Sequence, residues 1–272
     1  MNNGMKKPAR TRIKVCGLRD YDMAMAALNA GADSLGFVFV KDSPRHIEPE
    51  EAWAIVRALP PMHTTVGLTV NASVEAYSKI ERACPTDYGQ LHGDESVDVV
   101  KACGPRVIKA IVFDPQRIEE ELRKWEAVAE VDAILIDGSA GGMGEAFDWS
   151  ALASAASACE KPIILAGGLN AENVGDAIRT VRPWAVDVSS GVERERGVKD
   201  AAMIRAFCAA VREADAALAK DCFRILPLLA ALGAVVSSEA ALENTTAPGA
   251  ASGFTNRRVD RTHGRGARAV MN

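Results

Sequence analysis

An α/β fold of the (β/α)8 type, with eight parallel strands closed into a barrel, is predicted for residues 12–214 of this 272-residue chain. Three observations predict it. Short runs rich in β-branched residues alternate with longer windows that have apolar residues at helical spacing. The alternation repeats eight times in about 200 residues, which suits a closed barrel. Glycine-rich and polar segments follow the strands, where such barrels have their functional loops.

The predicted strands follow one another with room for one helix between each pair. They are RIKVC (12–16), DSLGFVF (33–39), TTVGLTV (64–70), YGQLH (88–92), RVIKAIVF (106–113), DAILID (132–137), PIILA (162–166) and WAVDVS (184–189). Strands that are separated by single helices form a parallel sheet. A doubly wound open sheet is the alternative, and the number of strand and helix units favours the barrel.

The helical windows have apolar residues at a spacing of three and four. They are YDMAMAALNAG, PEEAWAIVRALP, SVEAYSKIERAC, DESVDVVKACG, RIEEELRKWEAVA, WSALASAASAC, AENVGDAIRTV and KDAAMIRAFCAAVREA. Gly31 follows the first window, and Asn71 and Ser73 open the third. Asp94 and Asp148 precede the fourth and sixth windows, so we expect each of these residues to cap a helix.

Residues 215–272 differ in character, and we expect a C-terminal extension there that is partly helical and then disordered. Residues 216–236 can lengthen the last helix, with a break at Pro227. From about residue 240 the sequence is rich in Ala, Gly, Thr and Arg and has no periodicity. The five arginines after residue 256 leave open a weak contact with an anionic partner.

Composition excludes several classes of function. The net charge is -4, so we expect no nucleic-acid partner, because binding to phosphates needs a positive excess. The longest apolar stretch, ILPLLAALGAVV, is too short to span a bilayer, so we expect no membrane partner. Six cysteines without a CxxC pair predict reduced thiols, no metal site and a cytoplasmic protein. No apolar stretch follows the basic start MNNGMKKPAR, which argues against a secretory signal.

Two strand ends predict a phosphate site. Gly167 and Gly168 close the seventh strand, and Ser189, Ser190 and Gly191 close the eighth. Glycines let main-chain N–H groups approach an anion, hydroxyls add donors, and barrels commonly bind phosphate in these two loops. Tight turns alone are the alternative for the glycines of either loop.

A thiol and a carboxyl group lie at two further strand ends. Cys16 ends the first strand, and Asp137 follows the apolar run AILI in the sixth. Most cysteines are small buried hydrophobic residues, and many aspartates cap a helix. The next helix begins nearly a dozen residues after Asp137, which weakens the capping explanation. Arg45 follows Ser43 and Pro44, and its planar fork suits a carboxylate, although a solvated loop arginine is the alternative.

Taken together, the motifs resemble the phosphoribosylanthranilate isomerase family. They are KVCGLRD (14–20), GADSLGFVF (31–39), SPRHI (43–47), VGLTVN (66–71), QLHGDE (90–95), GGMGEAFDW (141–149), LAGGLNAENV (165–174) and DVSSGVERERGVKD (187–200). The resemblance implies a TIM barrel that carries out an Amadori rearrangement of N-(5-phosphoribosyl)anthranilate in tryptophan biosynthesis, without metal or organic cofactor.

The resemblance also implies roles for single residues. Cys16 would be the general base and Asp137 the general acid. The implied substrate-binding residues are Arg45, His92, Gly142, Gly144, Gly167, Gly168, Asp187, Ser189, Ser190 and Gly191. Met143, Glu145 and His46 depart from the family pattern, which normally has a small hydroxyl residue, a lysine and a tyrosine there.

The rearrangement itself requires one acid and one base, independently of the resemblance. Opening of the ribose ring needs a proton donor, and enolamine formation needs a base on the other side of the sugar. At pH 7 an ordinary aspartate is protonated in about one molecule in a thousand, and an ordinary thiol is a few per cent thiolate. We therefore expect surroundings that favour protonated Asp137, and donors or cations that favour the Cys16 thiolate.

Two alternatives stay open at this point. Another phosphoribosyl-metabolising barrel would share the phosphate loops, but the ProFAR isomerase of histidine synthesis should have an aspartate in place of Cys16. Indole-glycerol-phosphate synthase relies on a lysine and glutamates in the pocket. A barrel that only binds a phosphorylated ligand, or a scaffold recruited through the basic tail, is the non-enzyme alternative. The sequence predicts no particular protein partner.

Overall fold

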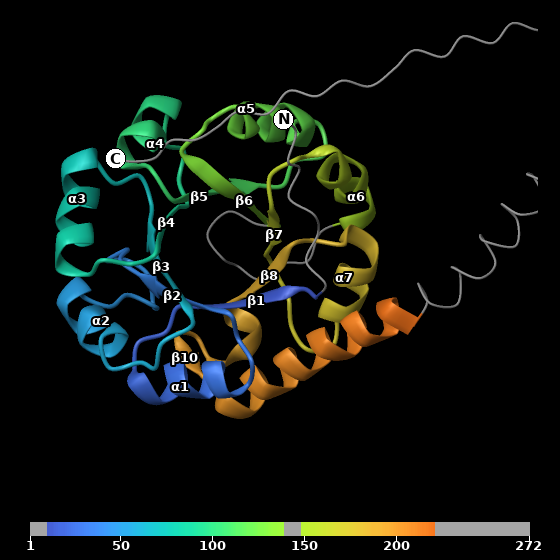
Figure 1. Cartoon of the computed structure of the whole chain (residues 1–272), viewed down its shortest axis with the longest axis horizontal. Coiled ribbons are helices and arrows are strands. Elements are labelled where there is room, and N and C mark those ends of the chain that lie inside the picture. Colours follow the sequence, from blue (N-terminus) through green and yellow to red (C-terminus); the bar gives the residue numbers. More distant parts are fainter. Residues whose placement is uncertain (1–9, 139–147, 221–272) are drawn as a thin grey trace, which may run out of the picture. The chain divides into compact units, whose positions relative to one another are not determined.

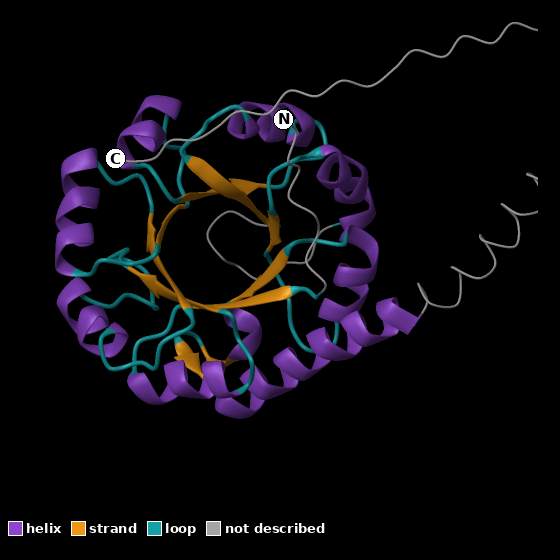
Figure 2. Cartoon of the chain, viewed as in Figure 1, coloured by secondary structure: helices purple, strands orange, loops and turns teal. Residues whose placement is uncertain are grey.

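The computed structural model describes residues 10–138 and 148–220, and these residues form a closed barrel of parallel strands. The strands are β1 (Arg12–Cys16), β2 (Ser34–Val38), β3 (Thr64–Thr69), β4 (Tyr88–Leu91), β5 (Val107–Val112), β6 (Val131–Asp137), β7 (Ile163–Leu165) and β8 (Ala185–Val188). Figure 2 shows them as a ring with the helices outside it. The predicted TIM barrel is confirmed, and every predicted strand agrees with its observed bounds to within one residue at either end.

The helices alternate with the strands (Figure 1). They are α1 (Tyr21–Asn29), α2 (Pro49–Val56), α3 (Val74–Ala83), α4 (Val97–Cys103), α5 (Ile118–Glu126), α6 (Trp149–Ala158), α7 (Val174–Val181) and a last helix over 201–220. Ser73 and Asp148 cap α3 and α6 as predicted, each accepting a main-chain N–H. The predictions for Asn71 and Asp94 are wrong. Ser73 is the N-cap of α3, and Ser96 caps α4 and accepts from Val99 N.

The last helix forms hydrogen bonds with the residues just before β1 and just after α1. Arg212 donates to the carbonyl oxygens of Thr11 and Gly31 at 2.9 and 2.8 Å. Asp215 accepts from the main-chain N and the hydroxyl of Thr11 at 2.9 and 2.7 Å. The helix therefore continues past the predicted boundary at residue 214, and the predicted division into barrel and extension stays a prediction. Residues 221–272 lie outside the described part of the chain.

Alternation along the strands decides which side chains enter the barrel. In β1, Ile13 and Val15 belong to the large apolar cluster that joins strands and helices. Lys14 and Cys16 have the opposite parity and point into the ring. In β6, Ala133 and Leu135 lie in the inner apolar cluster, so Asp137 shares their face. The inner face of the barrel is thus polar at the carboxyl ends of the strands and apolar toward their amino ends.

A short hairpin follows β8 and was not predicted. A turn of 3-10 helix (Ser190–Val192) leads into β9 (Glu193–Glu195), which pairs antiparallel with β10 (Val198–Lys199). Gly197 in its turn has φ of +84°, and a Cβ there would lie 2.4 Å from the carbonyl oxygen of Pro44. The hairpin therefore packs directly on the loop that holds Arg45. Within residues 10–138 and 148–220, no helix has the length and apolar character that crossing a membrane requires.

Candidate active site

A cavity of about 350 Å³ opens at the carboxyl ends of the strands, and it brings together most of the predicted site residues. Those that line it are Cys16, Arg45, His92, Asp137, Gly167, Gly168, Asp187, Ser189 and Ser190. Gly191 is not among the lining residues. Gly142 and Gly144, together with Met143 and Glu145, lie outside the described residues. The sequence therefore predicted nine residues of one cavity that come from six of its strand ends and loops.

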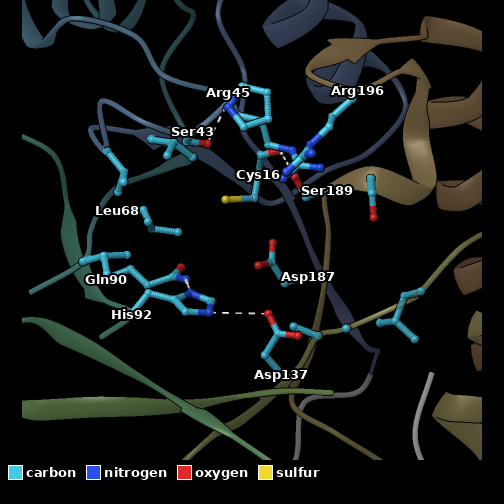
Figure 3. Close-up of a pocket in the computed structure, with 18 of the residues that line it drawn as sticks. Cys16, Ser43, Arg45, Leu68, Gln90, His92, Asp137, Asp187, Ser189 and Arg196 are labelled. Atoms are coloured by element: carbon cyan, nitrogen blue, oxygen red, sulfur yellow. Dashed lines mark hydrogen bonds and ion pairs between the residues drawn. The ribbon is translucent and has the colours of Figure 1, made fainter. Parts of the chain in front are cut away.

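Cys16 contributes its sulfur to this cavity from the end of β1 (Figure 3). The residue is 4% exposed and contacts Val38 and Leu68. Gly36 lies opposite it in the sheet, and a Cβ on Gly36 would come within 2.8 Å of the Cys16 sulfur. Because any other residue at position 36 would displace the thiol, a glycine in β2 makes room for the proposed base.

The electrostatic surroundings of Cys16 differ from the expectation. Burial, the largest effect, raises the pKa of the Cys16 thiol, and the negative charge of Asp187 adds to it. Lys14 and Lys199 act in the opposite direction, as the predicted cationic neighbours should. They do not outweigh burial, so the pKa of the thiol is raised overall although the predicted cationic neighbours are present. Lys14 is itself held by Asp187, whose two carboxylate oxygens each lie 3.1 Å from its Nζ.

Asp137 lies at the end of β6 on another wall of the cavity and is 5% exposed. Its Oδ2 lies 3.4 Å from Nε2 of His92, which follows β4. The other ring nitrogen of His92, Nδ1, lies 2.9 Å from Nε2 of Gln90. Figure 3 shows the chain of three side chains facing Cys16, with Asp187 between them in that view. His92, predicted as a substrate-binding residue, thus also touches the proposed acid.

Arg45 is held by a carboxylate that the sequence analysis did not single out. Its Nε and Nη2 donate to the two oxygens of Glu193 at 2.7 and 3.0 Å. Glu193 also accepts from Lys199 Nζ at 2.7 Å and from Gly197 N at 3.1 Å. Burial by itself would raise the pKa of Glu193, but the donors from Arg45 and Lys199 outweigh it and hold that pKa at about 2. Glu193 is therefore a fixed anion that positions the arginine.

Ser189 links this cluster to the strand of the proposed base. Lys199 donates to the carbonyl oxygen and the hydroxyl of Ser189 at 2.9 and 3.2 Å. The same hydroxyl lies 3.1 Å from the carbonyl oxygen of Cys16. The loop after β8 and the end of β1 are thereby held in one arrangement.

The predicted phosphate loops have the backbone that an anion site needs. Gly167 and Gly168 both adopt positive φ, +85° and +63°. A Cβ on Gly167 would lie 2.2 Å from Gly138 N, so only glycine fits beside the end of β6. Gly191 packs against the loop instead, since a Cβ there would lie 1.9 Å from Leu169 O. Gly167 and Gly168 themselves line the cavity, so the turn after β7 forms part of its wall.

The sequence reasoning missed several residues of the site. They are Lys14, Gly36, Gln90, Glu193, Arg196 and Lys199. Lys14 had a usable signal, because the alternation of side chains along β1 places it on the same face as Cys16, inside the barrel. Glu193 in the hairpin had none, since its partner Arg45 is 148 positions away in the chain. Among the described residues, no group of three or more His, Cys, Asp or Glu side chains is arranged to bind a metal ion.

Comparisons with known proteins identify the family of the chain. Residues 13–210 match the family model of N-(5'phosphoribosyl)anthranilate (PRA) isomerase. The N-(5'-phosphoribosyl)anthranilate isomerase of Leptothrix cholodnii is 47% identical over 218 residues, which cover 77% of this chain and 94% of that protein.

Two solved structures are similar over the same region. Phosphoribosyl anthranilate isomerase from Thermotoga maritima aligns with a TM-score of 0.68 and 37% identity, covering 75% of this chain and 99% of that one. A phosphoribosyl anthranilate isomerase in complex with reduced 1-(o-carboxyphenylamino)-1-deoxyribulose 5-phosphate aligns with a TM-score of 0.66 and 36% identity, covering 75% and 99%. The chain therefore belongs to the N-(5'-phosphoribosyl)anthranilate isomerase family, the isomerases of tryptophan biosynthesis.

Proposed function

We propose that this isomerase converts N-(5-phosphoribosyl)anthranilate to 1-(2-carboxyphenylamino)-1-deoxyribulose 5-phosphate, with Asp137 as the general acid and Cys16 as the general base. One observation carries the assignment of roles. The sulfur of Cys16 and the carboxyl group of Asp137 line the same cavity from two different strand ends. A sugar lying between them would have an acid near one face and a base near the other.

The proton transfers balance with these two groups. Asp137 gives its proton to the ring oxygen of the ribose, the ring opens, and the nitrogen lone pair forms the Schiff base. Cys16 then takes the proton from the neighbouring sugar carbon, and the electrons of that C–H bond form the enolamine. The Cys16 thiol then returns its proton to the former aldehyde carbon, and the enol hydroxyl gives its proton to the Asp137 carboxylate, which yields the aminoketose and restores both groups. While Asp137 is a carboxylate, the N–H of His92 that faces it would stabilise that charge.

The cavity offers a place for each end of the substrate. We assign the phosphate to the main chain of Gly167 and Gly168 and to Ser189 and Ser190, because these residues line the cavity in the two loops where barrels commonly bind phosphate. The ring carboxylate is assigned to the side of Arg45. The roles of Asp187, Gly191, Gly142 and Gly144 in substrate binding stay predictions. A small phosphorylated molecule is thus the proposed binding partner of this chain.

The thiols support a reducing compartment. Cys16, Cys84, Cys103, Cys159 and Cys208 are all free in the described part of the chain. Because disulfides persist in oxidising compartments and are rare in the cytosol, we assign the reaction to the cytoplasm.

Two substitutions test the proposed roles. Cys16→Ala and Asp137→Asn should each lower kcat by about 10²–10⁴-fold, the usual contribution of a general acid or base. The assay follows the fluorescence of phosphoribosylanthranilate as the purified full chain consumes it. Cys159→Ala and Asp176→Asn are matched controls on the outside of the barrel and should keep full activity. A loss of less than about tenfold in either test variant would contradict the role assigned to that residue.

A further inference from the structure

Arg196 is a cation at the cavity to which the sequence analysis assigned no role. It lies in the turn between β9 and β10 and lines the cavity. Its side chain is exposed, and it forms no hydrogen bond or ion pair with any other residue in 10–138 or 148–220. Figure 3 shows it extending from the hairpin toward Arg45, Ser189 and Cys16. A guanidinium in this place is available to a ligand.

The turn that carries Arg196 is held firmly against the loop of Arg45. The next residue, Gly197, has φ of +84°, and a Cβ added to it would lie 2.4 Å from the carbonyl oxygen of Pro44. The main-chain N of Gly197 donates to Glu193 at 3.1 Å, and the same carboxylate holds Arg45. Arg196 and Arg45 are therefore neighbours in the cavity wall, and their spacing is set by Glu193.

Arg45 cannot offer its whole fork to a substrate while it binds Glu193. Its Nε and Nη2 form a two-point contact with that carboxylate at 2.7 and 3.0 Å. The N–H groups that remain are those on Nη1 and the second one on Nη2. Among the described residues that line the cavity, Arg45 and Arg196 are the two with a permanent positive charge. A carboxylate that needs two-point recognition would find the free fork on Arg196.

We propose that Arg196 is a specificity-determining residue, whose guanidinium binds the ring carboxylate of the substrate together with the remaining donors of Arg45. This inference rests on the proposed function. The phosphate is assigned elsewhere because the left-handed glycines after β7 provide main-chain donors, whereas the contact between Gly197 and Pro44 places Arg196 on the Arg45 side. The substrate class that this wall selects is an N-aryl amine with an acidic group on the ring.

The test compares two substrates with two variants of the full chain. Arg196→Gln should raise KM for phosphoribosylanthranilate by about tenfold, the value of one charge-assisted contact, with kcat changed less than about twofold. Arg196→Lys should fall between this variant and the unmodified chain, because it keeps the charge and loses the fork. Arg194→Gln is the matched control, since Arg194 lies in the same hairpin and does not line the cavity. Its KM should not change.

The second substrate is N-(5-phosphoribosyl)aniline, which lacks the ring carboxylate. Arg196→Gln and the unmodified chain should have the same KM for it, and inorganic phosphate should inhibit both equally. An unchanged KM for phosphoribosylanthranilate in Arg196→Gln would overturn the inference. So would an equal loss with both substrates, which would assign Arg196 to the phosphate. Absence of turnover by the unmodified chain would overturn the proposed function and this inference with it.

Discussion

The imidazole of His92 lies between Gln90 and the proposed acid, with Nε2 of His92 3.4 Å from Oδ2 of Asp137. The amide nitrogen of Gln90 lies 2.9 Å from Nδ1 of the same ring. Because the amide nitrogen of Gln90 is a donor, Nδ1 of His92 accepts from it. The ring proton of His92 is then on Nε2, which faces the carboxyl group of Asp137. Gln90 therefore acts as a positioning residue for the acid through the tautomer of His92.

The first prediction concerns this tautomer. Gln90→Leu should lower kcat by about fivefold, the value of one lost hydrogen bond of roughly 1 kcal/mol, because His92 is then free to place its proton on Nδ1. ¹⁵N NMR of the histidine should show the change of tautomer directly. Gln116→Leu, at an exposed position, is the control. An unaltered NMR signature in Gln90→Leu would contradict the role of Gln90.

The second prediction concerns the pH dependence of the base. Burial raises the pKa of the Cys16 thiol, so the active thiolate is scarce at neutral pH and increases as the pH rises toward that value. The rate of alkylation of Cys16 by iodoacetamide, which needs only the thiolate, should therefore rise by up to about tenfold per pH unit between pH 7 and 9, measured as the difference from Cys16→Ala. A plateau of this rate below pH 8 would contradict the direction of the pKa shift.

The third prediction concerns the space around the thiol. Gly36→Ala places a methyl group 2.8 Å from the Cys16 sulfur and 3.0 Å from its Cα. The thiol must move, so kcat should fall at least about tenfold, and overpacking should cost about 1–3 kcal/mol of unfolding free energy. Gly175→Ala is the matched control, because the nearest atoms there belong to the flexible end of Arg179. Chemical denaturation and steady-state kinetics measure both effects, and full activity of Gly36→Ala would show that the thiol position is not critical.

The fourth prediction concerns the carboxylate that holds Arg45. The pKa of Glu193 is about 2 in the folded chain, below its ordinary value of 4.5. The ionised form therefore stabilises the fold above pH 4.5, and this contribution is lost as the pH falls toward 2. Glu193→Gln should lower the unfolding free energy by about 3 kcal/mol near pH 7, and the difference from the unmodified chain should shrink below pH 4.5.

The control for this prediction lies in the same hairpin. Glu195→Gln changes an exposed carboxylate and should leave stability unchanged at every pH. Urea unfolding at several pH values measures both variants. A difference for Glu193→Gln that stays constant from pH 7 to pH 3 would contradict the assigned pKa.

Local pattern was enough to predict the barrel and the two chemical groups. The strand runs are bounded by glycines and polar residues, and their observed ends agree to within one residue because burial on both faces demands continuous apolar stretches. Cys16 and Asp137 were identifiable because each directly ends such a run. The helix caps show the limit of this reasoning, since Ser96 rather than Asp94 accepts from the first turn of α4.

What the sequence by itself determined was thus the (β/α)8 architecture, the family and the strand ends that carry the chemistry. Only the tertiary structure decided how these groups are held: Glu193 binds Arg45 across 148 positions, and Gly36 makes room for the Cys16 sulfur. It also decided that burial outweighs Lys14 and raises the pKa of Cys16. The physical reason is range, since propensity and periodicity act between near neighbours, whereas ion pairing, close approach and desolvation depend on which distant segments the closed ring brings together.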